Sequence, residues 1–98
     1  MGSLSAAEQV GLPVRLKDVT LGRVVDILFD PGRRRVLGYV VDCGDEALRF
    51  LPFAASQPSE EEIAVSSALM LLDDVAFYRK NGVSYRALDK VENGANAA

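Results

Sequence analysis

Apolar and polar residues alternate in the first part of the chain. Leu12, Val14 and Leu16 alternate with proline and basic residues, which predicts a half-buried strand over residues 12–17. Pro13 is compatible with this strand because a proline near the start of a strand removes no ladder hydrogen bond. A mostly apolar run predicts a second strand over residues 22–30, and we expect residues 20–22 to form the short connection.

The second strand and its return form the clearest local pattern, a β-hairpin. Asp30, Pro31 and Gly32 predict its turn, because proline presets φ at the first central position and glycine accepts positive φ at the second. Alternating apolar residues predict the return strand over residues 35–43. Strict alternation gives the strand over residues 22–30 two faces, with Val25, Ile27 and Phe29 on one face and Val24, Asp26 and Leu28 on the other.

Shorter strands are predicted further along the chain. A turn over residues 43–46 precedes a strand over residues 47–53, and a polar connection over residues 56–62 precedes a strand over residues 63–66, with an extension to Met70 left open. Turn signals at roughly ten-residue spacing are typical of small barrels and sandwiches. This spacing predicts an antiparallel meander.

The segment over residues 73–88 has two interpretations. In the first, Asp73 or Asp74 caps a helix that runs through Lys80 and stops at a left-handed Asn-Gly pair. In the second, the same Asn-Gly pair is the turn of a hairpin. We favour the helix, because acidic residues at its start and basic residues at its end complement the helix dipole. The sequence therefore predicts a mainly β fold, a small antiparallel β-barrel of about six strands with a short C-terminal helix.

The two ends of the chain differ in composition from the middle. Residues 1–10 are small and polar, which predicts a flexible N-terminal segment with a helical turn after Ser5. Residues 89–98 are rich in glycine, asparagine and alanine and predict a disordered tail. We expect one domain over residues 11–88.

Composition narrows the function classes. The 98 residues hold no histidine, which excludes histidine-based triads and most catalytic zinc sites. We therefore expect neither an enzyme nor a bound metal or cofactor. The net charge of −3 gives no overall positive field, so we do not expect direct contact with nucleic acid.

The single cysteine and the absence of long apolar runs indicate the environment. Cys43 has no second cysteine for a disulfide, which favours a reducing compartment. Because Asp42 and an apolar strand flank Cys43, we expect no cation near it and interpret it as a small core residue. No run reaches the roughly 18 apolar residues of a membrane helix, and no signal peptide is evident. We expect a cytoplasmic protein without membrane insertion.

The order of the predicted strands resembles the PRC-barrel domain family, which includes the photosynthetic reaction-centre H subunit and the C-terminal domain of a ribosome maturation factor. The residues that carry the resemblance are Gly22, Val24 and Asp26 of a Gly-x-Val-x-Asp element, Gly38 of the hairpin, and Leu51, Pro52 and Phe53. The resemblance covers about residues 12–72. It implies a small β-barrel without catalytic residues that acts as a docking or assembly module.

The family suggests three functions for this chain. The resemblance implies first a protein-interaction module that docks a protein partner or associates with itself, as a homodimer for example. A ribosome or RNA-processing accessory that binds a ribosomal protein is an alternative, although the ten residues before Gly11 are too few for that factor's N-terminal barrel. A small-ligand or ion-binding regulator linked to membrane energy metabolism is another, although the H subunit's membrane helix is missing here.

Two groups of residues are candidates for contact with a partner. Arg33, Arg34 and Arg35 concentrate positive charge at the hairpin tip, which is either a solvated turn or a contact for an acidic surface.

The second group is aromatic. On the predicted helix, Val75 and Tyr78 share a face, while Phe77 points elsewhere. We expect part of this apolar cluster to pack on the barrel. The surplus, Phe77, Tyr78 and Tyr85, forms a candidate interface, where aromatic residues are favoured.

Four further residues have structural interpretations. Gly22 and Gly38 relieve crowding in a coiled sheet, and Pro52 ends a strand. Asp26 lies in an apolar strand, so we expect it to accept hydrogen bonds from neighbouring backbone or a cross-strand arginine.

Overall fold

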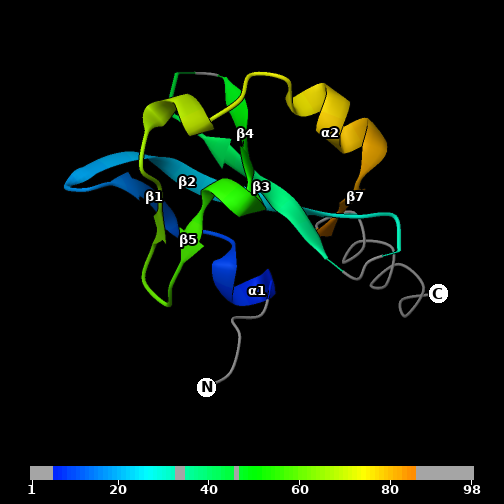
Figure 1. The fold of residues 1–98 in the computed structure, drawn as a ribbon, viewed down its shortest axis with the longest axis horizontal. Helices are drawn as coiled ribbons and strands as arrows, with labels where there is room; N and C mark the ends of the chain where they lie inside the picture. Colours follow the sequence, from blue (N-terminus) through cyan, green and yellow to red (C-terminus); the bar gives the residue numbers. More distant parts are fainter. Residues whose placement is uncertain (1–5, 33–34, 46, 86–98) are drawn as a thin grey trace.

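The computed structural model describes residues 6–32, 35–45 and 47–85. These residues form a seven-stranded sheet, with a short helical turn before it and a helix near its end (Figure 1). The elements are α1 (Ala6–Gln9), β1 (Pro13–Leu16), β2 (Val19–Phe29), β3 (Val36–Asp42), β4 (Leu48–Pro52), the 3₁₀ turn η1 (Phe53–Ala55), β5 (Gln57–Pro58), β6 (Ile63–Ala64), the 3₁₀ turn η2 (Ala68–Met70), α2 (Val75–Asn81) and β7 (Val83–Ser84). The predicted mainly β fold with a short C-terminal helix is confirmed.

The sheet is barrel-like but open. Its strands pair in the order β4-β3-β2-β1-β6-β5, and β7 pairs with the C-terminal end of β2. The pairings are antiparallel except that of β1 with β6, which is parallel and aligns Val14 with Ile63. This pairing departs from the expected meander, because the chain leaves β4 through η1 and β5 and returns to β1 rather than to β4. Strand β5 also lies inside the segment that we expected to be a connection.

The turn between β1 and β2 lies at Lys17 and Asp18, so the connection expected at residues 20–22 is wrong. Lys17 takes the left-handed φ of 54° that this tight turn requires. Gly22 belongs to β2, where a Cβ atom would lie 2.5 Å from the backbone oxygen of Asp42. The glycine therefore serves a close approach of two strands and not a loop.

A β-bulge in β2 changes the predicted faces of this strand. Val24 pairs with Val41 of β3, whereas Asp26 pairs with the adjacent Val40, so Val25 is an extra residue. An extra residue shifts the alternation of side chains by one position. Residues before the bulge therefore point to the face opposite to the one that strict alternation predicts.

The sheet buries apolar side chains on both faces. One group, called the main core below, consists of Val14, Val24, Ile27, Tyr39, Val41, Leu51, Ile63 and Val65. The other group, called the outer cluster, consists of Leu28, Val40, Phe50 and Val75, with Val25, Leu37, Leu72 and Tyr78 packed against it. Because Val75 and Tyr78 come from α2, this helix covers the outer face of the sheet (Figure 1).

Gly38 lies under the ring of Phe50 in the outer cluster. A Cβ atom at Gly38 would lie 2.2 Å from the backbone oxygen of Leu51 and 2.5 Å from the Phe50 ring. Pro52, which pairs with Gly38, is the last residue of β4 and leads directly into η1. Gly38 therefore lets β3 and β4 approach closely near the end of β4.

Asp26 is a buried polar residue of β2, with 4% of its surface exposed. Its Oδ1 accepts a hydrogen bond from the Ile27 amide at 2.8 Å, and its Oδ2 accepts one from the Ser84 hydroxyl at 2.5 Å. The backbone partner matches the expectation, and the Ser84 hydroxyl is a side-chain partner that the sequence did not suggest. Because Ser84 lies in β7, this contact attaches the C-terminal strand to the middle of the sheet.

The C-terminal segment is a helix followed by a strand and not a hairpin. Asp74 caps α2, since its Oδ1 accepts a hydrogen bond from the Phe77 amide at 3.3 Å. The expected left-handed stop is wrong, because Gly82 has an extended φ of −131°. Gly82 instead lies close to Leu37 and Phe29. A Cβ atom at Gly82 would lie 3.0 Å from the Leu37 Cδ1 and 3.1 Å from the Phe29 carbonyl oxygen. This fit lets the chain continue directly into β7.

The start of the described chain also packs on the sheet. Helix α1 matches the helical turn expected after Ser5, and Val10 packs against the main core. The Gly11 amide donates a hydrogen bond to the Val24 carbonyl at 2.8 Å. The tail expected over residues 89–98 lies outside the described residues.

Candidate interaction surface

Of the predicted basic tip, only one arginine is described. Arg33 and Arg34 lie outside the described residues, and Arg35 is exposed just before β3. Arg35 lines a hollow of about 400 Å³, whose other lining residues are Asp30, Val36, Leu37, Pro52, Phe53 and Ala54. The hollow lies where β3 extends beyond the end of β4.

Phe53, in this hollow, is an exposed aromatic that we did not propose as a contact residue from the sequence. Its side chain is 44% exposed, and its ring centroid lies 6.4 Å from that of Tyr39. It follows Pro52, which ends the strand. That proline is the available signal, because beyond it the alternation of β4 no longer assigns Phe53 to a buried face.

Tyr39 lies in the main core with no exposed surface. Its hydroxyl is buried and makes no hydrogen bond of ordinary geometry with the described residues. Burial raises the pKa of Tyr39 to about 12, and the opposing influence of the Ser56 hydroxyl is smaller. Tyr39 is therefore a neutral core residue at ordinary pH.

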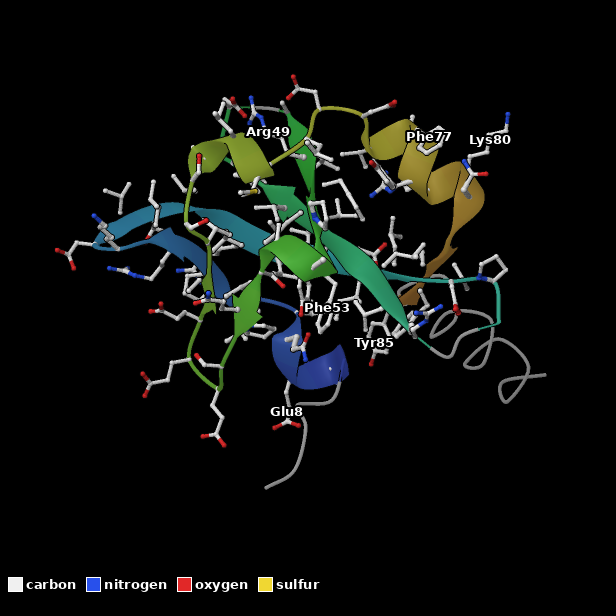
Figure 2. All side chains as sticks on the ribbon, viewed as in Figure 1. Glu8, Arg49, Phe53, Phe77, Lys80 and Tyr85 are labelled. Atoms are coloured by element: carbon white, nitrogen blue, oxygen red, sulfur yellow. The ribbon has the colours of Figure 1, made fainter. Side chains whose placement is uncertain are left out.

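Helix α2 presents one aromatic ring to solvent. Val75 is buried and Tyr78 is half-buried in the outer cluster, whereas Phe77 is 54% exposed. Figure 2 shows Phe77 and Lys80 on the side of α2 that faces away from the sheet. The prediction that Val75 and Tyr78 share the packed face of this helix while Phe77 points elsewhere is confirmed.

The exposed ring of Phe77 belongs to a well-fixed part of the molecule. Its amide donates to Asp74 and its carbonyl accepts from the Asn81 side chain at 2.8 Å. Its ring contacts Tyr78 edge to face, with centroids 5.2 Å apart and planes at 88°. Tyr78 stacks in turn on buried Phe50, with centroids 3.9 Å apart and planes at 9°. Three rings in sequence thus join Phe77 to the outer cluster.

Tyr85 does not belong to the same surface. It is half-buried and packs against the main core, on the other face of the sheet from α2 (Figure 2). The aromatic residues grouped by the sequence therefore separate, with Phe77 on the surface and Tyr78 and Tyr85 packed on different cores.

The charges of α2 are divided between its ends. Asp73 and Asp74 precede the helix, and Arg79 and Lys80 occupy its last turn; all four are exposed. The Asp73 Oδ1 accepts from the Arg49 Nε at 3.3 Å. In the part of the chain that the structure describes, Asp74, Arg79 and Lys80 form no ion pair.

Arg49 connects the turn before β4 with the segment before α2. Besides Asp73, it donates two hydrogen bonds to the Asp45 carboxylate, at 3.0 and 3.2 Å. These bonds hold the pKa of Asp45 below its usual value and raise the pKa of Arg49. A smaller contribution to the Arg49 shift comes from Cys43. The expectation that Cys43 has no neighbouring cation is therefore wrong, because β4 brings Arg49 alongside it.

Cys43 is half-buried against the main core, as a small core residue would be. It also lines a shallow hollow of about 380 Å³, together with Thr20, Leu21, Gly22, Arg23, Val25, Asp42 and Gly44. Within residues 6–32, 35–45 and 47–85, no three acidic or cysteine side chains come together as metal ligands. No helix in the same ranges is long and apolar enough to cross a membrane.

The fold and its surface define a small mainly β domain, with a barrel-like open sheet, a helix on the outer face and one fixed exposed aromatic on that helix. The profile of the PRC-barrel domain family matches residues 1–69, and the chain belongs to this family. The match ends just before the segment that carries Leu72 and α2 onto the outer face. No curated protein and no solved structure matches the chain.

Proposed function

We propose that this chain is a non-enzymatic protein-interaction module of the cytoplasm, which docks a protein partner or a second copy of itself. PRC-barrel domains often mediate protein interactions, and the family profile covers most of the described sheet. The single cysteine and the exclusion of histidine-based chemistry support the cytoplasmic and non-enzymatic parts of this proposal.

The observation that carries the proposal is the exposed and fixed ring of Phe77. Aromatic residues with few rotatable bonds are frequent among the residues that dominate protein interfaces. A ring that is already held loses little conformational freedom on binding. Hydrogen bonds at the Phe77 backbone and the edge-to-face contact with Tyr78 supply this restraint.

Affinity capture from native lysate tests the proposal, with the wild-type chain and Phe77→Ala as baits. Leu69→Ala is a matched control, because Leu69 is an apolar residue that is 87% exposed on η2. We expect wild type and Leu69→Ala to recover the same specific protein, or a second copy, and Phe77→Ala to lose it. Recovery of nothing but the bait, together with a monomeric mass by light scattering, would reject an interaction role.

A further inference from the structure

The exposed side of α2 is self-complementary in charge. Its acidic residues lie at the N-terminal end and its basic residues at the C-terminal end, with Phe77 between them. Asp74, Phe77 and Lys80 are three residues apart and therefore follow one side of the helix. All three are exposed, and Figure 2 shows Phe77 and Lys80 pointing away from the sheet. The order along this side is thus acid, aromatic ring, base.

We propose that this side of α2 binds the same side of a second copy, antiparallel, around a two-fold axis at Phe77. In such a pair, the residue three positions before Phe77 faces the residue three positions after it. Asp74 of each copy then faces Lys80 of the other, and the two Phe77 rings meet at the axis. The inference rests on the proposed interaction role of α2 and specifies its occupant.

The free charges of α2 are consistent with this register. Asp73 is already engaged by Arg49. Asp74 uses Oδ1 for the Phe77 amide, and neither it nor Lys80 forms an ion pair within residues 47–85 or with the other described ranges. A parallel pairing would place Asp74 beside Asp74 and Lys80 beside Lys80, which repel. The antiparallel two-fold pairing places an Asp74 opposite a Lys80 at two equivalent positions.

The size of the helix sets the expected strength. Seven residues give a helix about 10 Å long, and its exposed side is smaller than the roughly 800 Å² per partner of a standard stable interface. We therefore expect a weak dimer that forms only at high protein concentration.

Sedimentation equilibrium of the full chain, from 10 µM to 1 mM, tests the pairing. Phe77→Ala and Lys80→Glu should each lower the association constant about tenfold or more. Because the dimer is two-fold symmetric, Phe77→Ala removes both rings from the contact, and Lys80→Glu makes both charge pairs repulsive. Arg79→Glu is the matched control: it makes the same charge change at a neighbouring exposed position that faces no acid in this register. It should leave association within about twofold of wild type.

A charge exchange distinguishes this register from general electrostatic attraction. Asp74→Lys and Lys80→Glu should each associate more weakly than wild type when alone, while their equimolar mixture should form a heterodimer in which both pairs are again opposite in sign. Asp74→Asn retains a capping side chain and loses the charge, so it tests the Asp74 contribution alone if Asp74→Lys unfolds the helix. It should weaken association without changing the circular dichroism spectrum.

Three results would overturn the pairing. A wild-type chain that is monomeric at 1 mM rejects it outright. Association that responds equally to Arg79→Glu and Lys80→Glu rejects the register, as does a mixture that stays monomeric although both variants are folded. If a monomeric chain still captures a different protein through Phe77, the second-copy inference fails while the proposed interaction role stands.

Discussion

Replacing Gly38 with alanine tests how closely β3 and β4 are packed. The added Cβ atom would lie 2.2 Å from the Leu51 carbonyl oxygen and 2.5 and 2.9 Å from two atoms of the Phe50 ring. The oxygen belongs to a paired strand, and the ring is held by Tyr78 stacked at 3.9 Å, so neither neighbour moves without loss of other contacts. Overpacking of a core typically costs 1–3 kcal/mol. With contacts this short, we expect Gly38→Ala to lower the free energy of unfolding by about 3 kcal/mol or more.

Urea denaturation followed by circular dichroism measures this loss, and Gly11→Ala is the matched control. Gly11 has a φ of 97° with no atom within 4 Å of an added Cβ, so its substitution carries only a conformational cost of about 1–2 kcal/mol. In a Phe50→Leu background, Gly38→Ala should cost less than in wild type, because the ring contact is gone while the Leu51 contact remains. If Gly38→Ala is no more destabilising than Gly11→Ala, the proposed crowding at this position is wrong.

Three other contacts give predictions of their own. Asp26→Ala and Ser84→Ala should show a coupling energy of about 1–3 kcal/mol in a double-mutant cycle of urea denaturation, and additive losses would contradict the hydrogen bond. Because burial raises the pKa of Tyr39 from 10.0 to about 12, the unfolded chain loses this proton first, so stability should fall as the pH rises from 10 to 12. Tyr39→Phe should flatten that part of the stability profile, and an unchanged slope would exclude Tyr39 as its source. Asp74→Ala should cost about 1 kcal/mol in thermal unfolding through loss of the cap on Phe77, whereas Asp74→Asn should cost clearly less.

The surface proposed for interaction was only partly visible in the sequence. Helical periodicity separated Phe77 from Val75 and Tyr78, because side chains at i and i+3 share a helix face. Periodicity did not separate Tyr85 from this group. Tyr85 follows β7, which pairs with β2, and its side chain packs on the main core. Phe53 was also not proposed as a contact residue, because its exposure depends on where β4 ends.

The sequence by itself determined the local elements whose causes are local. The strand β3 and the N-terminal cap and charges of α2 each depend on residues within a few positions of one another. Such short-range preferences require no knowledge of distant contacts. The predicted turn mechanism and strict alternation are wrong, because Gly32 has no positive φ and Leu37 packs on the outer cluster while Tyr39 and Val41 lie in the main core. The sequence also excluded histidine-based triads and most catalytic zinc sites, since a chain without histidine lacks imidazole in any fold.

Only the tertiary structure decided features that depend on distant backbone. The bulge at Val25 arises from the register between β2 and β3, and a single extra residue reverses which face each earlier side chain occupies. The placement of Arg49 beside Cys43 depends on how β4 returns along β3, and the parallel pairing of β1 with β6 depends on how the chain returns after β4. The sequence suggested that Gly22 relieves crowding, but only the structure shows that the crowding residue is Asp42, twenty positions away across the sheet. Contacts between strands determine these features, and the alternation of residues along one strand does not predict such contacts.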